Sequence, residues 1–352
     1  MLDSSVVDDL TPWLIFFAAA AAIVAGGTQL AREGDRIAEQ TGIGGLWIGA
    51  ILLASATSLP EVVTDVSAAI IDEPDLAVGD LMGSSMANMM VLAVVDLIHR
   101  RHRVLQRVSQ GHTLVASLAI ALTALAASFV LADLGWSVAR VGVDTIIIAV
   151  LYLMGTRVVF RQEYLQALAR IAERTIGRQD ADQDAPAQEQ ARPRMPQPGS
   201  LAKFAAGAAV ILVAAPFLAS SGSDISDRAG LDASFVGVAL LAVTTSLPEL
   251  VTSIWSVRHG AYDLAVGNLF GSNAFNIFAL VFVDIAYRQG PVLSDVSQAQ
   301  AIAALFAVLL MATAMMGIIY HAERRFWLLE PDAGAIMIAY LAGLLLVYEA
   351  GK

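Results

Sequence analysis

The hydrophobic residues of this chain form long runs that alternate with shorter polar stretches. Ten runs are long enough for a helix to cross about 30 Å of hydrocarbon. They lie at residues 12–30, 46–71, 75–98, 113–131, 146–159, 201–218, 234–257, 263–287, 301–320 and 333–348. Four of them, at 46–71, 75–98, 234–257 and 263–287, carry polar residues near their centres. The pattern predicts ten transmembrane helices, four of which have polar side chains at mid-membrane depth.

The composition agrees with this pattern. Of the 352 residues, 57% are hydrophobic and 15% are charged, which is too apolar for a single water-soluble core. We therefore expect an all-α polytopic membrane protein with the lipid bilayer as its surroundings. The net charge of −11 argues against nucleic acid as a partner, and the absence of cysteine excludes disulfides and thiolate metal sites.

The first hydrophobic run follows an acidic segment that contains Asp3, Asp8 and Asp9. A secretory signal peptide has a basic start and a small-residue cleavage site instead. We therefore expect this run to be retained as the first helix.

The basic residues indicate an orientation. If the predicted loops are assigned alternately to the two sides, 17 of the 21 Lys and Arg residues fall on one side, which the positive-inside rule makes cytoplasmic. Arg140, Arg228, Arg288 and Lys352 fall on the other side. This predicts a protein of the cell (inner or plasma) membrane with both termini outside. The long loop 162–200 is expected to be cytoplasmic and disordered, as a solvated linker or, alternatively, a regulatory segment.

The chain contains an internal duplication. Residues 57–66 read TSLPEVVTDV and residues 245–254 read TSLPELVTSI, while residues 75–84 read DLAVGDLMGS and residues 263–272 read DLAVGNLFGS. The offset is 188 throughout, and 19 of the 40 positions from Thr57 to Asp96 are identical to their partners. So many identities exceed what two unrelated apolar helices share by composition.

The duplication predicts two inverted five-helix repeats. Residues 1–161 form the first repeat and residues 201–352 the second, and because five is odd the second enters the membrane upside down. Inverted repeats are typical of transporters, whose substrate site lies near the bilayer midplane on broken helices. A duplicated scaffold without a transport role is the alternative.

Each repeat has a span interrupted by Thr-Ser-Leu-Pro-Glu. Proline removes a backbone donor, so carbonyl oxygens near the interruption are expected to be free to bind a cation. On a helix, the hydroxyl and carboxyl groups of this motif share one face. They belong to Thr57, Ser58 and Glu61 in the first repeat and to Thr245, Ser246 and Glu249 in the second. A Glu at bilayer depth marks an ion pathway by default, although a protonated structural Glu is the alternative at a single site.

The following helix of each repeat adds a Ser and an Asn one turn apart. These are Ser84 and Asn88, then Ser272 and Asn276. The Asn side chains are predicted ligands, although interhelical hydrogen bonding is an alternative role. Because every proposed donor is an oxygen, the site suits hard cations such as Ca²⁺ and Na⁺.

These motifs resemble the alpha-repeats of the cation/Ca²⁺ exchanger superfamily. TSLPE followed by GNLFGSNAFN at residues 267–276 is most similar to the Na⁺/Ca²⁺ exchanger branch. The resemblance covers residues 42–98 and 230–286. It implies a ten-helix secondary active antiporter, without enzymatic activity or a cofactor, in which Na⁺ influx drives Ca²⁺ extrusion by alternating access. H⁺-coupled exchange of Ca²⁺ or another divalent cation is the alternative.

The resemblance also implies a set of ligands. The side-chain ligands are Thr57, Ser58, Glu61, Ser84, Asn88, Thr245, Ser246, Glu249, Ser272 and Asn276, and the backbone oxygens are those of Ala54 and Ala242.

The first repeat departs from the family pattern. Asp80 replaces an expected Asn, Ser85 replaces a second Asn, and Asp65 stands where the other repeat has Ser253. The predicted topology places Asp65 and Asp80 on the outer side of the centre. They are predicted to form an acidic outer vestibule or to act as a third carboxylate; a pair of water-exposed residues on the pathway wall is the alternative.

Two further function classes remain open. A membrane-embedded hydrolase could use paired Glu residues as acid and base, but it would also need a nucleophile or a His-rich metal set. A channel would be distinguished by single-channel currents. The coupling ion, the stoichiometry and the oligomeric state, for which a monomer is compatible with the pattern, are left open.

Overall fold

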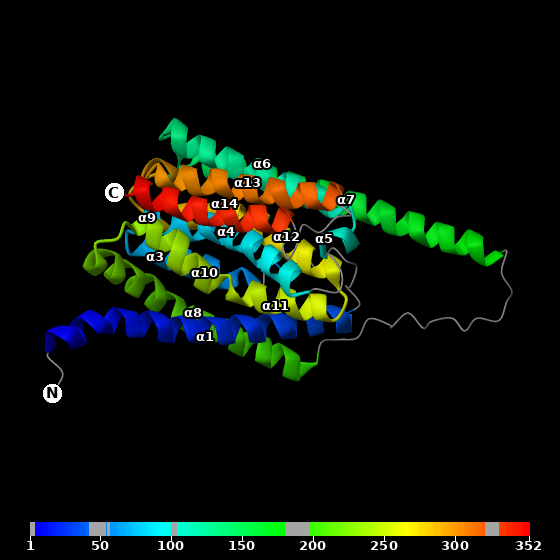
Figure 1. Cartoon of the computed structure of the whole chain (residues 1–352), viewed down its shortest axis with the longest axis horizontal. Helices are drawn as coiled ribbons and strands as arrows, with labels where there is room; N and C mark the ends of the chain where they lie inside the picture. The colour runs from blue at the N-terminus through cyan, green and yellow to red at the C-terminus, as the bar shows by residue number, and fades with distance from the viewer. Residues whose placement is uncertain (1–3, 42–53, 55–56, 100–103, 180–196, 321–330) are drawn as a thin grey trace.

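The computed structural model describes residues 4–41, 54, 57–99, 104–179, 197–320 and 331–352. Figure 1 shows a bundle of roughly parallel and antiparallel helices from which one long helix projects at one end. The fold is helical, as predicted, except for one short hairpin of two strands that lies before the projecting helix.

The elements of the first half are α1 (Ser4–Thr41), α3 (Leu59–Ile70), α4 (Pro74–Ile98), α5 (Val104–Arg107), α6 (His112–Ala132), β1 (Ser137–Val138), β2 (Val141–Gly142) and α7 (Val143–Gln179). Those of the second half are α8 (Pro198–Ala229), α9 (Ala233–Val236), the π-helical turn η1 (Gly237–Leu241), α10 (Ala242–Thr245), α11 (Leu247–Arg258), α12 (Tyr262–Ala286), the 3₁₀ turn η2 (Val292–Ser294), α13 (Ala299–Tyr320) and α14 (Pro331–Ala350).

Eight helices of the described part are long and apolar enough to cross a membrane. A ninth span results if 233–245 and Leu247–Arg258, which meet at a bend of 41°, are taken as one broken helix. Most of the first half of the predicted span 46–71 lies outside the described residues. The prediction of ten helices in two inverted repeats therefore stays a prediction.

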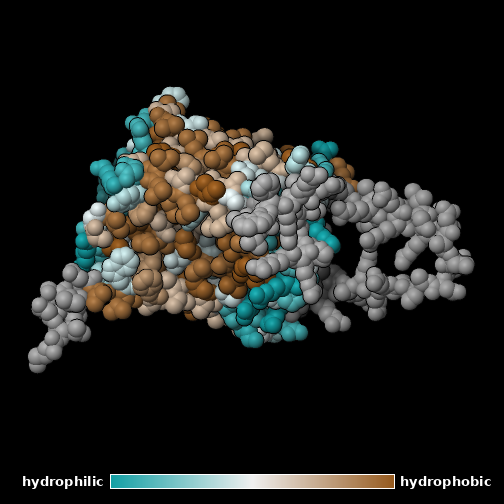
Figure 2. All heavy atoms as spheres, viewed as in Figure 1, coloured by the Kyte–Doolittle hydropathy of each residue, from teal (hydrophilic) through white to brown (hydrophobic). Residues whose placement is uncertain are grey.

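The surface has the character that a bilayer requires. A hydrophobic zone covers the middle of the bundle, and hydrophilic residues gather towards its ends (Figure 2). Large apolar side chains such as Phe17, Val213 and Ile338 are more than half exposed. In water such exposure would favour aggregation, whereas in lipid it meets hydrocarbon.

The most buried spans are α4 and α12, which follow the two Pro-Glu motifs. They lie at the centre of the bundle, between the pair formed by α1 and α8 and the group formed by α6, α13 and α14 (Figure 1). This position explains why their small and polar residues face protein instead of lipid.

Contacts at the helix ends repeat with the offset of 188. The Asp96 carboxylate accepts a hydrogen bond from the Val104 backbone N–H at 2.8 Å, and Asp284 accepts one from Val292 at 2.8 Å. These two Asp residues therefore hold turns at helix ends. The repetition shows that the duplication extends from sequence to tertiary contacts.

A second pair of contacts links the two halves. Asp75 at the start of α4 accepts hydrogen bonds from the Ser297 N–H at 2.8 Å and from the Gln300 side chain at 3.2 Å. At the corresponding positions, Asp263 accepts from the Ser109 N–H at 2.7 Å, and its Oδ1 lies 3.1 Å from Nε2 of His112. The first turn of each central helix is thus tied to the other half of the chain.

The prediction of a disordered loop at 162–200 is wrong for its first part. Helix α7 continues through Gln179, and α8 already begins at Pro198. Residues 162–179 are rich in Ala, Leu, Gln, Glu and Arg, all good helix formers, and the proline residues begin only at Pro186. Local propensity therefore extends the helix beyond its hydrophobic part. Residues 180–196 lie outside the described residues.

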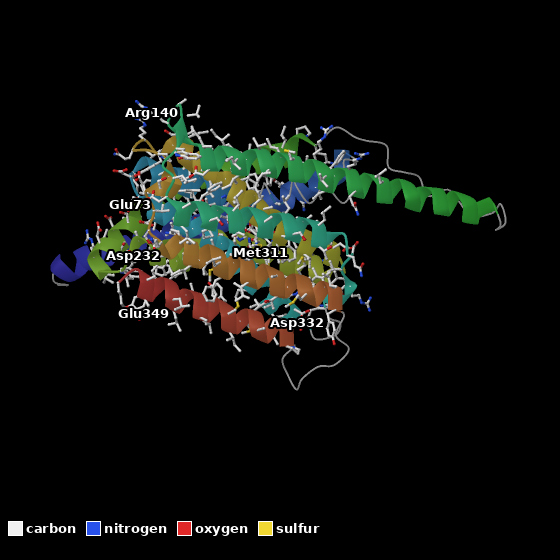
Figure 3. The ribbon with its side chains drawn as sticks, turned by 90° about the horizontal axis from the view of Figure 1, so that it is seen from above. Glu73, Arg140, Asp232, Met311, Asp332 and Glu349 are labelled. Carbon is white, nitrogen blue, oxygen red and sulfur yellow. The ribbon has the colours of Figure 1, made fainter. Side chains whose placement is uncertain are left out.

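Figure 3 shows which loops share an end of the bundle. Glu73, Arg140, Asp232 and Glu349 lie towards one end, Asp332 lies towards the opposite end, and Met311 lies between them. This grouping agrees with the alternating assignment of loops made from the sequence.

Candidate cation site

The two motif glutamates are joined to one buried cluster by serines of the opposite half. The Ser58 hydroxyl donates to Oε1 of Glu249 at 3.5 Å, and the Ser246 hydroxyl donates to Oε1 of Glu61 at 3.4 Å. The two contacts are related by the offset of 188, and all four side chains are buried. The structure therefore brings together the two carboxylates that the sequence singled out.

The threonines make a second symmetry-related pair of contacts. Thr57 Oγ1 donates to Oδ1 of Asn268 at 3.5 Å, and Thr245 Oγ1 donates to Oδ1 of Asp80 at 2.9 Å. Ser84 Oγ also donates to Asp80 Oδ1, at 3.2 Å. Asp80 therefore lies inside the cluster and bonds to two predicted ligands.

The helix breaks position the glutamates. Helices α3 and α11 begin directly after Ser58 and Ser246, with Pro60 and Pro248 in their first turns. Proline suits this place because its missing N–H would have no partner there in any case. Each break puts a Glu in the first turn, where the helix dipole favours negative charge.

The predicted backbone ligands lie one turn before the breaks. The Ala54 carbonyl accepts from the Ser58 N–H at 2.9 Å and from Thr57 Oγ1 at 3.2 Å, and the Ala242 carbonyl accepts from the Ser246 N–H at 3.1 Å. These oxygens belong to the same buried region, but in this structure they bond within their own segments.

The serine and asparagine residues predicted as ligands on α4 and α12 are fully buried. Asn88 Nδ2 donates to Oδ1 of Asn273 at 2.9 Å, and Asn273 Nδ2 donates to the Ser85 carbonyl at 3.2 Å. The Asn88 amide thus has the interhelical role considered as an alternative, while its oxygen keeps no hydrogen-bond partner among the described residues. Asn273, which sequence reasoning did not select, is the first Asn of GSNAFN, so its place in the motif was the available signal.

Many oxygens of the cluster have no hydrogen-bond partner within the described part of the chain. They are Glu61 Oε2, Glu249 Oε2, Asp80 Oδ2, both oxygens of Asp65, Asn88 Oδ1, Ser272 Oγ and Asn276 Oδ1. Buried polar atoms nearly always have hydrogen-bond partners in native proteins, so this group of unpaired oxygens indicates a ligand-binding site. Carboxylate, hydroxyl and amide oxygens are what Ca²⁺ and Na⁺ bind.

Asp65 and Asp80 do not lie at a water-exposed vestibule or pathway wall. Both side chains have an exposed fraction of 0% because α3 packs against α4. In place of the expected exposure, the structure shows carboxyl groups within the polar cluster.

The centre of the cluster depends on a close approach of α4 to the broken helix. A Cβ atom added at Gly83 would lie 2.6 Å from the Val238 Cα, and one added at Gly237 would lie 2.6 Å from the Leu76 carbonyl oxygen. Neither backbone can yield easily, so both positions require glycine. This contact places Ser84 of α4 beside Thr245, and the two hydroxyl oxygens lie 3.3 Å apart.

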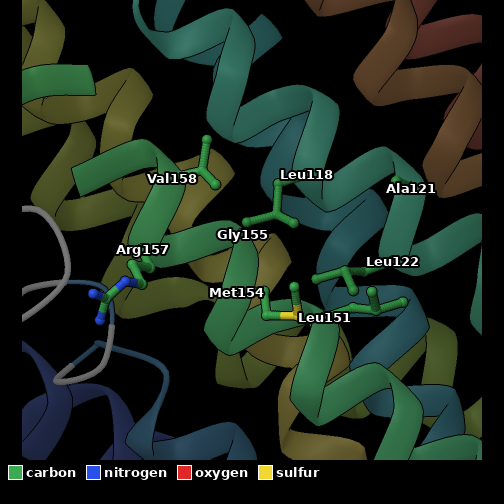
Figure 4. A pocket seen from close by; sticks show the side chains of 8 residues that line it. All are labelled: Leu118, Ala121, Leu122, Leu151, Met154, Gly155, Arg157 and Val158. Carbon is green, nitrogen blue, oxygen red and sulfur yellow. The ribbon is translucent and has the colours of Figure 1, made fainter. Parts of the chain in front are cut away.

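Two other features lie apart from the cluster. A surface groove of about 410 Å³ between α6 and α7 is lined by Leu118, Ala121, Leu122, Leu151, Met154, Gly155, Arg157 and Val158 (Figure 4). Its lining contains no predicted site residue.

The histidines His99 and His112 contact Tyr262 and Asp263 at the start of α12, outside the cluster.

Comparison with known proteins places the chain in a family. A model of the family described as sodium/calcium exchanger protein matches residues 11–161 and 199–349. The two matched segments are themselves offset by 188. Together they cover most of the chain.

Individual proteins show the same relationship. The chain is 31% identical over 240 residues to inner membrane protein YrbG of Escherichia coli, a match that covers 67% of each chain. It is 36% identical over 73 residues, 21% of each chain, to the sodium/calcium exchanger MaX1 of Methanosarcina acetivorans.

Solved structures share the fold. The sodium-calcium exchanger NCX_Mj superposes with a TM-score of 0.60 at 18% identity, covering 96% of this chain and 99% of the other. The H⁺/Ca²⁺ exchanger CAX superposes with a TM-score of 0.65 at 14% identity, covering 97% and 84%. With its membrane-spanning helices, its duplicated motifs and the two matched segments, the chain belongs to the sodium/calcium exchanger protein family.

Proposed function

We propose that this protein is a secondary active antiporter in which Na⁺ influx drives Ca²⁺ extrusion by alternating access. The observation that carries the proposal is the reciprocal pairing at the centre of the bundle. Each motif Glu accepts a hydrogen bond from a motif Ser of the other half. A rocking motion of one helix group against the other would open this shared cluster to one side at a time.

The charge of the two motif glutamates suits such an exchange. The carboxylates of Glu61 and Glu249 neutralise one Ca²⁺, whereas three Na⁺ would leave one net positive charge. A three-for-one exchange therefore moves one charge per cycle, and a potential of 100 mV biases it by about 2.3 kcal/mol.

Uptake of ⁴⁵Ca²⁺ into proteoliposomes tests the proposal. An outward Na⁺ gradient is expected to drive uptake by the wild type, and Glu61→Gln and Glu249→Gln are each expected to reduce it at least tenfold because a buried carboxylate ligand is lost. Glu349→Gln is the matched control, since Glu349 is an exposed residue paired with Lys352. Absent uptake by the wild type, or full activity of both site variants, would contradict the proposal.

H⁺-coupled Ca²⁺ exchange is the second candidate. The cluster holds four buried carboxyl groups, those of Glu61, Asp65, Asp80 and Glu249, which is more negative charge than one Ca²⁺ neutralises. Protons could occupy the remaining groups. This candidate requires ⁴⁵Ca²⁺ uptake driven by a pH gradient in Na⁺-free buffer, which the Na⁺-driven exchanger does not support.

A further inference from the structure

The two halves of the cluster differ in charge at two positions. Where the first half has Asp65 and Asp80, the second half has Ser253 and Asn268, which are also fully buried. One pair of contacts at these positions is related by the offset of 188, since Thr57 bonds to Asn268 as Thr245 bonds to Asp80. At these two positions the first half therefore carries carboxyl groups where the second half carries neutral side chains.

The two carboxyl oxygens of Asp80 differ in their hydrogen bonds. Its Oδ1 accepts hydrogen bonds from Thr245 at 2.9 Å and from Ser84 at 3.2 Å, whereas its Oδ2 has no hydrogen-bond donor among the described residues. The hydroxyl oxygens of Ser84 and Thr245 keep lone pairs that can bind a cation.

Asp65 supplies an independent indication of a ligand. It approaches from α3, its carboxyl group is in contact with that of Asp80, and neither of its oxygens has a hydrogen-bond donor in the described part of the chain. The ion pairs of Lys, Arg and His in that part of the chain involve Glu33, Asp263 and Glu349, and not these two groups. Buried carboxylates without a basic partner are stable when they share a cation, because the cation replaces mutual repulsion by attraction.

From this geometry we propose a second cation subsite, formed by Asp65 and Asp80 together with the hydroxyl oxygens of Ser84 and Thr245. It adjoins the central site of Glu61 and Glu249 through the shared ligands Ser84 and Thr245. Its oxygens suit a hard cation, Ca²⁺ or Na⁺. The inference rests on the proposed function in that such cations must reach the cluster, and it predicts that the chain binds one cation more than its two glutamates account for.

Equilibrium binding to the purified protein tests the subsite without requiring transport. Two numbers are measured at saturation: the ⁴⁵Ca²⁺ ions bound per chain in Na⁺-free buffer and the ²²Na⁺ ions bound per chain in Ca²⁺-free buffer. Both are determined for the wild type and for the double variant that combines Asp65→Ser with Asp80→Asn. These substitutions install the residues that the second half carries at the same positions. We expect the double variant to bind one ion fewer per chain in at least one arm, and the arm affected identifies the cation.

The controls separate the possible outcomes. Asp133→Asn removes a carboxylate from an exposed helix end and is expected to leave both stoichiometries unchanged. The thermal unfolding midpoint of each variant establishes folding, and the single variants Asp65→Ser and Asp80→Asn serve if the double variant does not fold. Unchanged stoichiometry in both arms, as a proton shared between Asp65 and Asp80 would give, overturns the subsite. A wild type that binds these cations but does not transport them would overturn the proposed function and leave this result standing.

Discussion

At the scale of single residues, the proposed site uses neutral hydroxyl groups as well as carboxylates. Within the described chain, no three side chains of Asp, Glu or His converge closely enough to hold a metal by themselves. In the proposed site, the hydroxyl groups of Ser58, Ser246, Thr57 and Thr245 supply the other part of the coordination sphere. Their hydroxyls can turn between a hydrogen bond to a carboxylate in the empty site and a bond to the cation in the filled one.

Replacing one of these hydroxyls should weaken cation binding without removing it. We expect Ser58→Ala or Ser246→Ala to raise the Ca²⁺ concentration for half-maximal uptake about tenfold, which corresponds to about 1.4 kcal/mol. The measurement is the Ca²⁺ dependence of Na⁺-driven uptake. Ser128→Ala, at an exposed Ser that bonds only to the carbonyl of its own helix, should leave this dependence unchanged.

At the scale of elements, the decisive contact is that of α4 with the broken helix. The π-helical turn η1 directly precedes α10, and α4 packs closely against both. A π-turn is often found at functional positions because it shifts the register of the helix that follows. Here it brings the Val238 backbone against Gly83 and so places Thr245 beside Ser84.

A methyl group at this contact should separate the two elements. Gly83→Ala is expected to destabilise the protein by about 1–3 kcal/mol, because the nearest atoms belong to the Val238 backbone, and to reduce uptake strongly. Thermal unfolding in detergent and the uptake assay measure the two effects. Gly334→Ala in α14, where a Cβ atom has open space, is the matched control. Equal behaviour of the two variants would contradict the proposed role of the contact.

The ends of the central helices allow a second test at this scale. His112 contacts Asp263 as Gln300 contacts Asp75, so a Gln should be able to replace this His. We expect His112→Gln to unfold at nearly the wild-type temperature. His112→Ala, which leaves Asp263 without this side-chain partner, should lose about 1–2 kcal/mol of stability. Equal loss in both variants would show that packing of the ring, and not the hydrogen bond, matters.

At the scale of the whole molecule, the two ends of the bundle must face different compartments. The excess of basic residues on one side predicts that the end with Glu73, Arg140 and Asp232 lies outside (Figure 3). The opposite end, with Asp332, would then be cytoplasmic.

The natural absence of cysteine makes this orientation directly measurable. Single variants Arg140→Cys and Asp232→Cys are expected to react with a membrane-impermeant thiol reagent added to intact cells. Asp332→Cys should react only after the membrane is opened. The reverse labelling pattern would show that the chain is inserted the other way round.

The sequence by itself determined the membrane class and the duplication, and it singled out the central residues of the candidate site. Hydrophobic runs, proline positions and the offset of 188 are local or periodic features, so they can be read before folding. Glu61 and Glu249 follow from such features because a carboxylate within an apolar span has few roles. The prediction of a disordered loop did not include the extension of α7 through Gln179. It was based on the composition of the whole segment 162–200, whereas helix propensity acts locally and is high only in the first part of that segment.

Only the tertiary structure decided which residues of the two halves meet. The contacts of Ser58 with Glu249, of Asp80 with Thr245 and of Asn88 with Asn273 join positions more than 160 residues apart. They depend on how closely helices pack, and hence on glycine contacts that no periodicity reveals. For the same reason the sequence left open whether Asp65 and Asp80 form an outer vestibule, line a wall or act as a third carboxylate, whereas packing of α3 against α4 buries both within the polar cluster.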